Sequence, residues 1–231
     1  MYSTIYSKCS IFHSIRNEKT QDVISIKSNL QSDNNYIAMA LADGISESAF
    51  SRKAGEKLTD FLASFLYDHY ESMICEIYQT AISDICAKVT EILDDMAESY
   101  SVDTSHFGST LCGAVTDGKK LFYFSCGDSI IFAINAEKQV CIVAEHCGAI
   151  SAYTHCFTES DIKYGVVSAD EFSALYLASD GFVSVIFEHG TESVKAEVKD
   201  FIINNNTKTL NEYLDNKLLM DDCSYCCAIL K

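Results

Sequence analysis

The chain has 231 residues, of which 48% are hydrophobic and 22% are charged, a composition that allows a substantial core and excludes a largely disordered protein. Its 33 acidic and 17 basic residues give a formal net charge of -16, which disfavours binding to nucleic acid or to an anionic membrane. The eleven cysteines lack the paired spacing of a zinc site, and no signal-peptide core or membrane-spanning apolar run is present. We therefore expect a soluble, cytoplasmic, monomeric protein whose cysteines are reduced.

The first half of the chain is predicted to contain a β-hairpin followed by two long helices. Residues 22–26 and 36–42 have the alternating and continuous apolar patterns of strands, and the turn residues 33–35 separate them. From residue 51 to residue 100, apolar side chains recur at helical spacing. This segment predicts two amphipathic helices that pack as an antiparallel pair.

The second half is predicted to return to short strands, with helices before the last one. Four strands form an antiparallel meander, a buried strand follows later, and two mostly helical segments precede a final strand. This order of elements favours an α+β fold, a layered α-β-β-α sandwich of two antiparallel sheets flanked by helix pairs. No proline or Gly/Ser-rich linker divides the chain, so we expect one domain over 1–231. The strands are expected at 109–115, 121–126, 130–135, 140–144, 174–178 and 223–230, and the helical segments at 182–188 and 191–217.

Five aspartates lie next to the predicted strands. Asp22 and Asp221 precede a strand, whereas Asp43, Asp128 and Asp180 follow one. An aspartate beside glycine at a strand end is more often a simple turn than a site. If these strands are neighbours, however, the carboxylates converge and repel one another unless a cation lies among them. Hard divalent cations such as Mg²⁺ or Mn²⁺ accept these oxygen ligands.

Six short motifs occur in an order that is typical of one family. The motifs are Gln21-Asp22, Ala42-Asp43-Gly44, Gly108-Ser109-Thr110-Leu111, Cys126-Gly127-Asp128-Ser129, Ala178-Ser179-Asp180-Gly181 and Asp221-Asp222-Cys223-Ser224. In this order they resemble the metal-dependent Ser/Thr protein phosphatases of type 2C, the PPM family, and most closely its compact bacterial subgroup. The resemblance covers nearly the whole chain, although each motif alone is short and turn-like.

The resemblance implies a binuclear centre of two Mg²⁺ or Mn²⁺ ions at one end of the sandwich. Asp43 would bridge both ions, and Gly44 would offer its carbonyl oxygen. Asp180 and Asp221 would complete the shell of one ion, and Asp22 would hold metal-bound water directly or from the next shell. The implied catalytic set is therefore Asp22, Asp43, Asp180 and Asp221, acting on phosphate monoesters with a metal-bridged water.

Two departures from the family pattern concern the third ion and the phosphate. Many members carry an acid four residues after the Asp of Ser-Asp-Gly, but this chain has Ser184 there, which puts a weak third ion shared with Asp128 in doubt. The Arg that grips the substrate phosphate often lies five residues before the first Asp, where this chain has Asn17. Arg16, one position earlier, is the candidate for phosphate binding.

Some residues near the motifs have two interpretations. Asp221 is preferred to Asp222 as the ligand because of its spacing to Ser224, but exchanged roles remain an alternative. His13 and His146 are each candidates for a general acid, yet a lone histidine is more often a surface residue or a satisfied core residue, so neither joins the catalytic set.

The first functional hypothesis is a phosphoserine/phosphothreonine protein phosphatase of the bacterial type, whose partners would be phosphorylated proteins and a cognate Ser/Thr kinase. The second is a catalytically weakened pseudophosphatase that acts as a phosphoprotein-binding or regulatory module, which the missing acid and the shifted Arg motivate. A third hypothesis is a structural acidic domain in which the Asp-Gly pairs are only turns.

Overall fold

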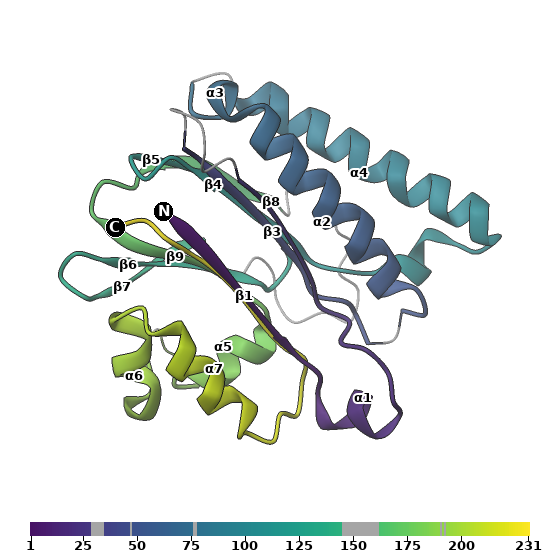
Figure 1. The fold of residues 1–231 in the computed structure, drawn as a ribbon. Coiled ribbons are helices and arrows are strands. Elements are labelled where there is room, and N and C mark those ends of the chain that lie inside the picture. Colours follow the sequence, from purple (N-terminus) through teal and green to yellow (C-terminus); the bar gives the residue numbers. More distant parts are fainter. Residues whose placement is uncertain (29–34, 47, 76–77, 145–161, 190, 192) are drawn as a thin grey trace.

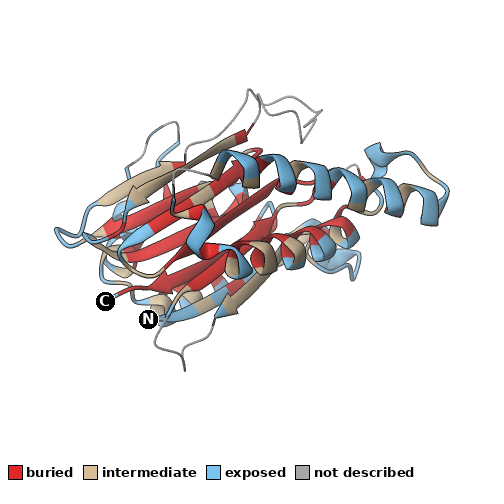
Figure 2. Cartoon of the chain, turned by 90° about the horizontal axis from the view of Figure 1, so that it is seen from above, coloured by how far each residue is buried: buried red, intermediate tan, exposed pale blue. Residues whose placement is uncertain are grey.

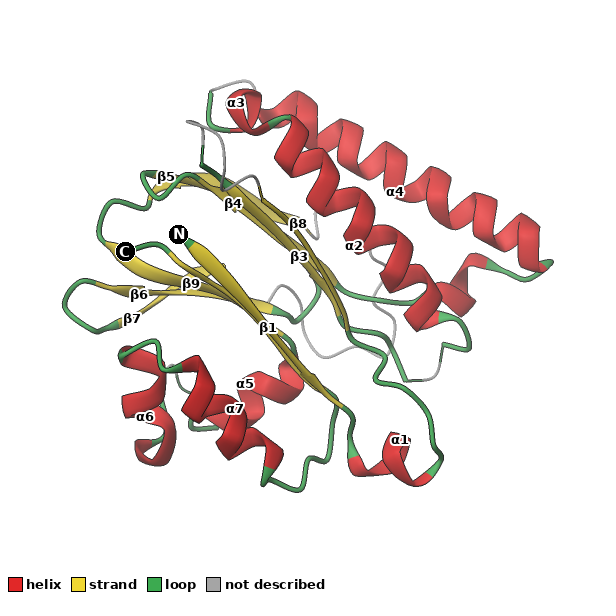
Figure 3. Ribbon diagram, in the orientation of Figure 1, coloured by secondary structure: helices red, strands yellow, loops and turns green. Residues whose placement is uncertain are grey.

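The computed structural model describes residues 1–28, 35–46, 48–75, 78–144, 162–189, 191 and 193–231. In these segments, the strands form two five-stranded sheets in which every neighbouring pair is antiparallel. The sheets pack face to face, and helices cover the outer face of each (Figures 1 and 3). The structure confirms the predicted α+β sandwich.

The first sheet has the strand order β1-β10-β9-β6-β7. It combines the two ends of the chain, because the first and last strands of the sequence lie side by side in it. Its strands are β1 (Tyr2–Lys8), β6 (Ile130–Asn135), β7 (Val140–Ala144), β9 (Phe172–Ala178) and β10 (Cys223–Ile229).

The second sheet has the order β2-β3-β4-β5-β8. The antiparallel pairing of its first two strands confirms the pairing expected of the predicted hairpin, although turn residues 33 and 34 lie outside the described residues. Its strands are β2 (Val23–Ser28), β3 (Ile37–Ala42), β4 (Leu111–Thr116), β5 (Lys120–Cys126) and β8 (Ile162–Ser168).

Helices lie on both outer faces of the sandwich. On the second sheet, α4 runs back alongside α2, which confirms the predicted antiparallel pair (Figure 1). On the first sheet lie α5, α6 and α7, and α1 lies near the end of β1 (Figure 1). The bounds are α1 (Ile11–Ile15), α2 (Ser51–Asp68), α3 (Tyr70–Met73), α4 (Tyr78–Tyr100), a 3₁₀ turn η1 (Thr104–Phe107), α5 (Asp180–Ile186), α6 (Ala196–Ile203) and α7 (Thr207–Asp215).

The strand β3 shows why the interior has several apolar layers. All six of its residues are buried. Successive side chains of a strand point to opposite faces, so Met39 and Leu41 join the core between the sheets, whereas Ala40 joins the core under α2. Figure 2 shows the buried strands enclosed by helices whose outer sides are exposed. A strand buried on both faces is a rigid support for the residues at its end.

The predicted four-strand meander is wrong. β4 and β5 form a hairpin in the second sheet, whereas β6 and β7 form a hairpin in the first, so the chain crosses between sheets after β5. The strands β1 and β8 were also not predicted. Both lie at sheet edges and are only partly buried, so their apolar pattern is weak.

None of the helices in the described parts of the chain combines the length and the apolar character that a bilayer span requires.

Candidate active site

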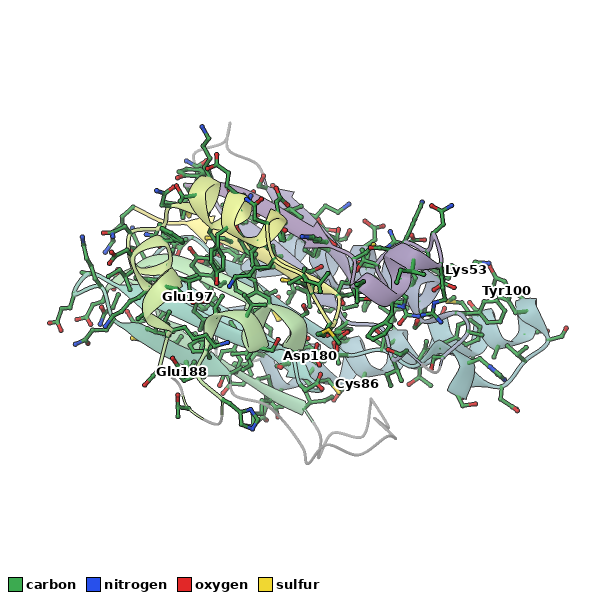
Figure 4. The ribbon with its side chains drawn as sticks, turned by 90° about the horizontal axis from the view of Figure 1, so that it is seen from below. Lys53, Cys86, Tyr100, Asp180, Glu188 and Glu197 are labelled. Carbon is green, nitrogen blue, oxygen red and sulfur yellow. The ribbon has the colours of Figure 1, made fainter. Side chains whose placement is uncertain are left out.

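The strand ends that carry the predicted aspartates meet at one end of the sandwich. Val23 pairs with Ala42, which places Asp22 and Asp43 at the same end of β2 and β3. In the other sheet, the Ser179 amide donates to the Ser224 carbonyl at 3.0 Å, which places Asp180 beside the residues that precede β10. Figure 4 labels Asp180 at the start of α5.

The backbone of Asp43 is held by the start of β4. Its amide donates to the Thr110 hydroxyl at 2.9 Å, and its carbonyl accepts from the Thr110 amide at 2.8 Å and from the Ser109 hydroxyl at 3.0 Å. The hydroxyls of Thr110 and Ser129 also lie 3.0 Å apart. These contacts occupy the main chain of Asp43 and leave its carboxylate to face the other aspartates.

At this end, the carboxylates of Asp22 and Asp43 have buried oxygens and lie close to one another. Asp22 is only 2% exposed, and neither of its carboxylate oxygens has a hydrogen-bond partner among the described residues; the same holds for Oδ2 of Asp43. Burial raises the pKa of Asp22 to about 7. Burial, followed by the negative charges of Asp22 and Asp180, holds the pKa of Asp43 well above its ordinary value.

Asp221 completes the group from the first sheet. Partial burial of its carboxylate, together with the charge of Asp180, raises the pKa of Asp221. The two residues are brought together by Gly181, where a Cβ atom would lie 2.0 Å from the Asp222 carbonyl oxygen and 3.3 Å from the Asp221 Cβ. Only glycine permits this approach of the two backbones.

Gly44 and Asp128 lie at the same end of the sandwich. Gly44 pairs with Ser109 in an isolated antiparallel β-bridge of the backbone. A Cβ atom at Gly44 would lie 2.9 Å from the Cβ of Gln21. Asp128 follows Gly127, whose positive φ of 104° lets the turn after β5 pack against Thr110. The structure therefore places all six predicted metal-site residues at one end of the two sheets.

The chemistry of this group fits a divalent cation. Among the described side chains, no three of His, Cys, Asp or Glu are arranged as a ready-made metal site. However, the carboxylates of Asp22 and Asp43 hold buried oxygens for which the described part of the chain offers no hydrogen-bond partner, and Asp180 adds a third negative charge. A cation bound there would remove the repulsion and supply the missing partner.

A sequence model of the family described as protein phosphatase 2C matches residues 11–218 of the chain. The chain belongs to this family. The match extends over the whole set of motifs from Asp22 to Asp180 and ends just before Asp221. It confirms the resemblance to the PPM-type Ser/Thr phosphatases.

Solved structures of bacterial phosphatases have the same fold. A variant of a bacterial serine phosphatase is 17% identical, with a TM-score of 0.73 over 100% of this chain and 99% of that chain. The serine/threonine phosphatase PstP/Ppp of Mycobacterium tuberculosis is 13% identical, with a TM-score of 0.65 over 100% and 98% of the two chains. Stp1 of Staphylococcus aureus is 14% identical, with a TM-score of 0.63 over 100% and 95%. No curated protein matches the chain in sequence.

Arg16, the candidate for phosphate binding, lies at the C-terminal cap of α1. Its side chain is 58% exposed, and its Nε donates to Glu18 Oε2 at 3.1 Å. With Phe12 and Ile15 it lines an open pocket of about 340 Å³. In this conformation the guanidinium of this family member is engaged with a carboxylate.

Two residues near the site were not predicted as part of it. Arg52, in the first turn of α2, donates from its guanidinium to the carbonyls of Thr20 and Asp22. His13 contacts Asp222 through Nδ1, at 2.8 Å from Oδ1. Arg52 had no signal in the sequence because it lies within a regular helical pattern. His13 was considered as a general acid and set aside, and its contact with Asp222 could not be predicted because the two residues are 209 positions apart. The other histidine considered, His146, lies outside the described residues.

Proposed function

We propose that this chain is a metal-dependent phosphoserine/phosphothreonine protein phosphatase. The observation that carries the proposal is the neighbouring carboxylates of Asp22 and Asp43: both oxygens of Asp22 and Oδ2 of Asp43 are buried and have no hydrogen-bond partner among the described residues. The negative charges of Asp180 and Asp221 lie beside this pair. Buried charges that serve only stability are normally paired or hydrogen-bonded, so this arrangement favours a cation site over a set of turns.

Two Mg²⁺ or Mn²⁺ ions would be held by Asp43, the Gly44 carbonyl, Asp180 and Asp221, with Asp22 as a further oxygen donor. Such ions activate water and neutralise the charge on a phosphoryl group. Asp128 is the candidate donor for a weak third ion.

The protein would contribute rigid placement of these donors. The reciprocal hydrogen bonds with Thr110 hold the Asp43 backbone, and Arg52 holds the carbonyl of Asp22. Arg16 would bind the phosphate of the substrate after exchanging Glu18 for it, since a guanidinium pairs with phosphate as readily as with carboxylate.

The substrates would be proteins phosphorylated on serine or threonine, and a cognate Ser/Thr kinase would oppose the reaction. We also propose that the chain acts as one domain over 1–231, as a monomer, in the cytoplasm.

The decisive experiment is a phosphatase assay with an aryl phosphate and a phosphoserine peptide, in Mn²⁺ and in EDTA. We expect Mn²⁺-dependent turnover by the wild type and a loss of at least about 100-fold in Asp43→Asn, because a metal-bridging carboxylate would be removed. Asp95→Asn, on the exposed side of α4, is the matched control and should retain activity. Turnover that persists in EDTA would contradict the proposal.

A pseudophosphatase is the second candidate. Arg16, the candidate for phosphate binding, is already paired with Glu18. At the position where other members carry an acid, this chain has Ser184, whose hydroxyl donates to the Gly181 carbonyl at 2.8 Å. This candidate predicts binding of Mn²⁺ and of a phosphopeptide without turnover in the same assay.

A further inference from the structure

The carboxylate of Asp222 forms hydrogen bonds with several residues of the segment that joins β1 to β2. Asp222 is 3% exposed, and Oδ1 accepts from the Ser10 amide at 2.7 Å. Oδ2 accepts from the Gln21 amide at 2.6 Å. Between these two points, His13, which is 6% exposed, places Nδ1 at 2.8 Å from Oδ1 and 2.9 Å from Oδ2. One buried carboxylate thus binds the beginning, the middle and the end of residues 10–21.

These contacts separate the roles of the two adjacent aspartates. An ionised carboxylate offers about four lone-pair directions, and Ser10, His13 and Gln21 together make four contacts with the oxygens of Asp222, two on each oxygen. Burial raises the pKa of Asp222, but the hydrogen bonds from Ser10, His13 and Gln21 lower it by more, so the group is ionised at neutral pH. Asp221 is exposed, and the only acceptor contact its carboxylate shows among the described residues is with the Asp222 amide, 2.8 Å from Oδ1. Asp221 therefore has oxygen lone pairs to offer to a cation, and Asp222 does not.

The main chain of Asp222 lies against the other half of the site. Its carbonyl oxygen occupies the space in which Gly181 would carry a Cβ atom, and the Ser179 hydroxyl lies 3.5 Å from it. Asp222 therefore joins three segments: the segment that ends at Asp22, the turn that carries Asp180, and its own neighbour Asp221. Its side chain binds only the first of these segments, so a shift of the side chain would move Asp22 relative to the main chain that carries Asp180 and Asp221.

We propose that His13 and Asp222 are a positioning pair for the metal centre, in which the His13 Nδ1–H bond holds the Asp222 carboxylate so that Asp22, Asp180 and Asp221 face a common point. This inference rests on the proposed function, because it requires a cation at that point. His13 does not touch the cation or the substrate; it acts only through Asp222.

The test compares variants of His13 by Mn²⁺ titration calorimetry and by thermal unfolding in EDTA. His13→Ala removes the donor, and we expect the Mn²⁺ dissociation constant to rise about 10- to 100-fold, as it does when a residue that orients a ligand is lost. His13→Asn places an amide N–H where Nδ1 was, and its dissociation constant should lie within about threefold of the wild-type value. His69→Ala, at the end of α2 remote from the aspartates, is the matched control and should bind as the wild type does.

A purely structural role would give a different result. His13→Ala would then lower the unfolding temperature in EDTA but bind Mn²⁺ with the wild-type dissociation constant at a temperature where it is folded, and that result would overturn the inference. If His13→Ala does not fold, Asp222→Asn takes its place, because the asparagine NH₂ group would face one of the three donors. Its Mn²⁺ dissociation constant and its unfolding temperature in EDTA are then compared in the same way. A wild type that binds no Mn²⁺ would overturn both the inference and the proposed function, whereas wild-type binding with unchanged variants overturns the inference alone.

Discussion

Asp43 and Thr110 hold each other by two hydrogen bonds that run in opposite directions. The Asp43 amide donates to the Thr110 hydroxyl at 2.9 Å, and the Thr110 amide donates to the Asp43 carbonyl at 2.8 Å. Because β3 and β4 are neighbours in the same sheet, this pair fixes the first residue beyond β3 to the start of β4. The direction of the Asp43 carboxylate thus depends on a hydroxyl that lies 67 positions away in sequence.

Thr110→Val tests this relationship. The valine side chain has the shape of threonine but leaves the Asp43 amide without its acceptor, so we expect the free energy of unfolding to fall by about 1–3 kcal/mol. We also expect kcat/KM for an aryl phosphate in Mn²⁺ to fall at least about 10-fold, because a misplaced ligand weakens the metal centre. Thr110→Ser keeps the hydroxyl and should retain most of the activity. Full activity in Thr110→Val would show that the hydroxyl has no role in placing Asp43.

Asp22→Asn should stabilise the protein when no metal is present. At pH 8 the wild-type carboxylate is ionised, buried and without a hydrogen-bond partner in the described structure, and it lies beside Asp43. Removing this charge should raise the free energy of unfolding by about 1–3 kcal/mol in EDTA at pH 8. At pH 5, where Asp22 is protonated, the gain should be small. Urea unfolding at both pH values checks this, with Asp95→Asn as the control. A loss of stability at pH 8 would mean that the carboxylate has a partner that a neutral amide cannot replace.

The same carboxylate predicts how the stability of the metal-free wild type depends on pH. The pKa of Asp22 rises from 3.8 to about 7 on folding, so the folded chain binds more protons than the unfolded chain between these values. The stabilisation from Asp22 is complete below about pH 4 and is lost as the pH rises through about 7. In this window the slope from one such group is at most about 1.4 kcal/mol per pH unit.

Thermal unfolding in EDTA at pH 5, 6, 7 and 8 measures this dependence. Asp22→Asn should show a flatter profile than the wild type over this range. Saturating Mn²⁺ should also flatten the wild-type profile, because the cation binds the ionised carboxylates. A wild-type profile in EDTA that rises from pH 5 to pH 8 would contradict the assigned direction of the pKa shift.

How much of the fold the sequence predicted depends on burial. β3 and β9 were found because their continuous apolar runs reflect burial on both faces. β1 and β8 lie at sheet edges, where half-exposed side chains leave no regular pattern, and Gly165 interrupts β8. The crossing from β5 to β6 was missed because an apolar strand pattern does not reveal which of two sheets the strand joins.

For the site as well, the sequence predicted the residues with a local pattern and missed the contacts between residues far apart in the chain. Asp43 and Asp180 were found because a carboxylate directly after a buried strand is visible in the sequence itself. His13 and Asp222, and the contact of Arg52 with the Asp22 carbonyl, depend on residues that meet only in the folded chain. Asp221 and Asp222 are adjacent, and the spacing to Ser224 favoured Asp221 without excluding exchanged roles, whereas the donors around each carboxylate distinguish the two residues.

Gly181→Ala should disrupt the site from the main chain. A Cβ atom at this position would lie 2.0 Å from the Asp222 carbonyl oxygen, a contact that requires the turn before β10 to move away from the turn after β9. We expect the unfolding free energy to fall by about 1–3 kcal/mol and Mn²⁺ binding to weaken more than in any control, since the displaced turns carry Asp180 and Asp221. Gly165→Ala is the matched control: it lies in the edge strand β8, where the atoms nearest to the new methyl group belong to the Tyr123 side chain, at 3.1 Å and beyond. Thermal unfolding in EDTA and Mn²⁺ titration of both variants measure the two effects separately. If Gly181→Ala binds Mn²⁺ as tightly as the wild type and Gly165→Ala do, then Asp180 and Asp221 do not share a cation.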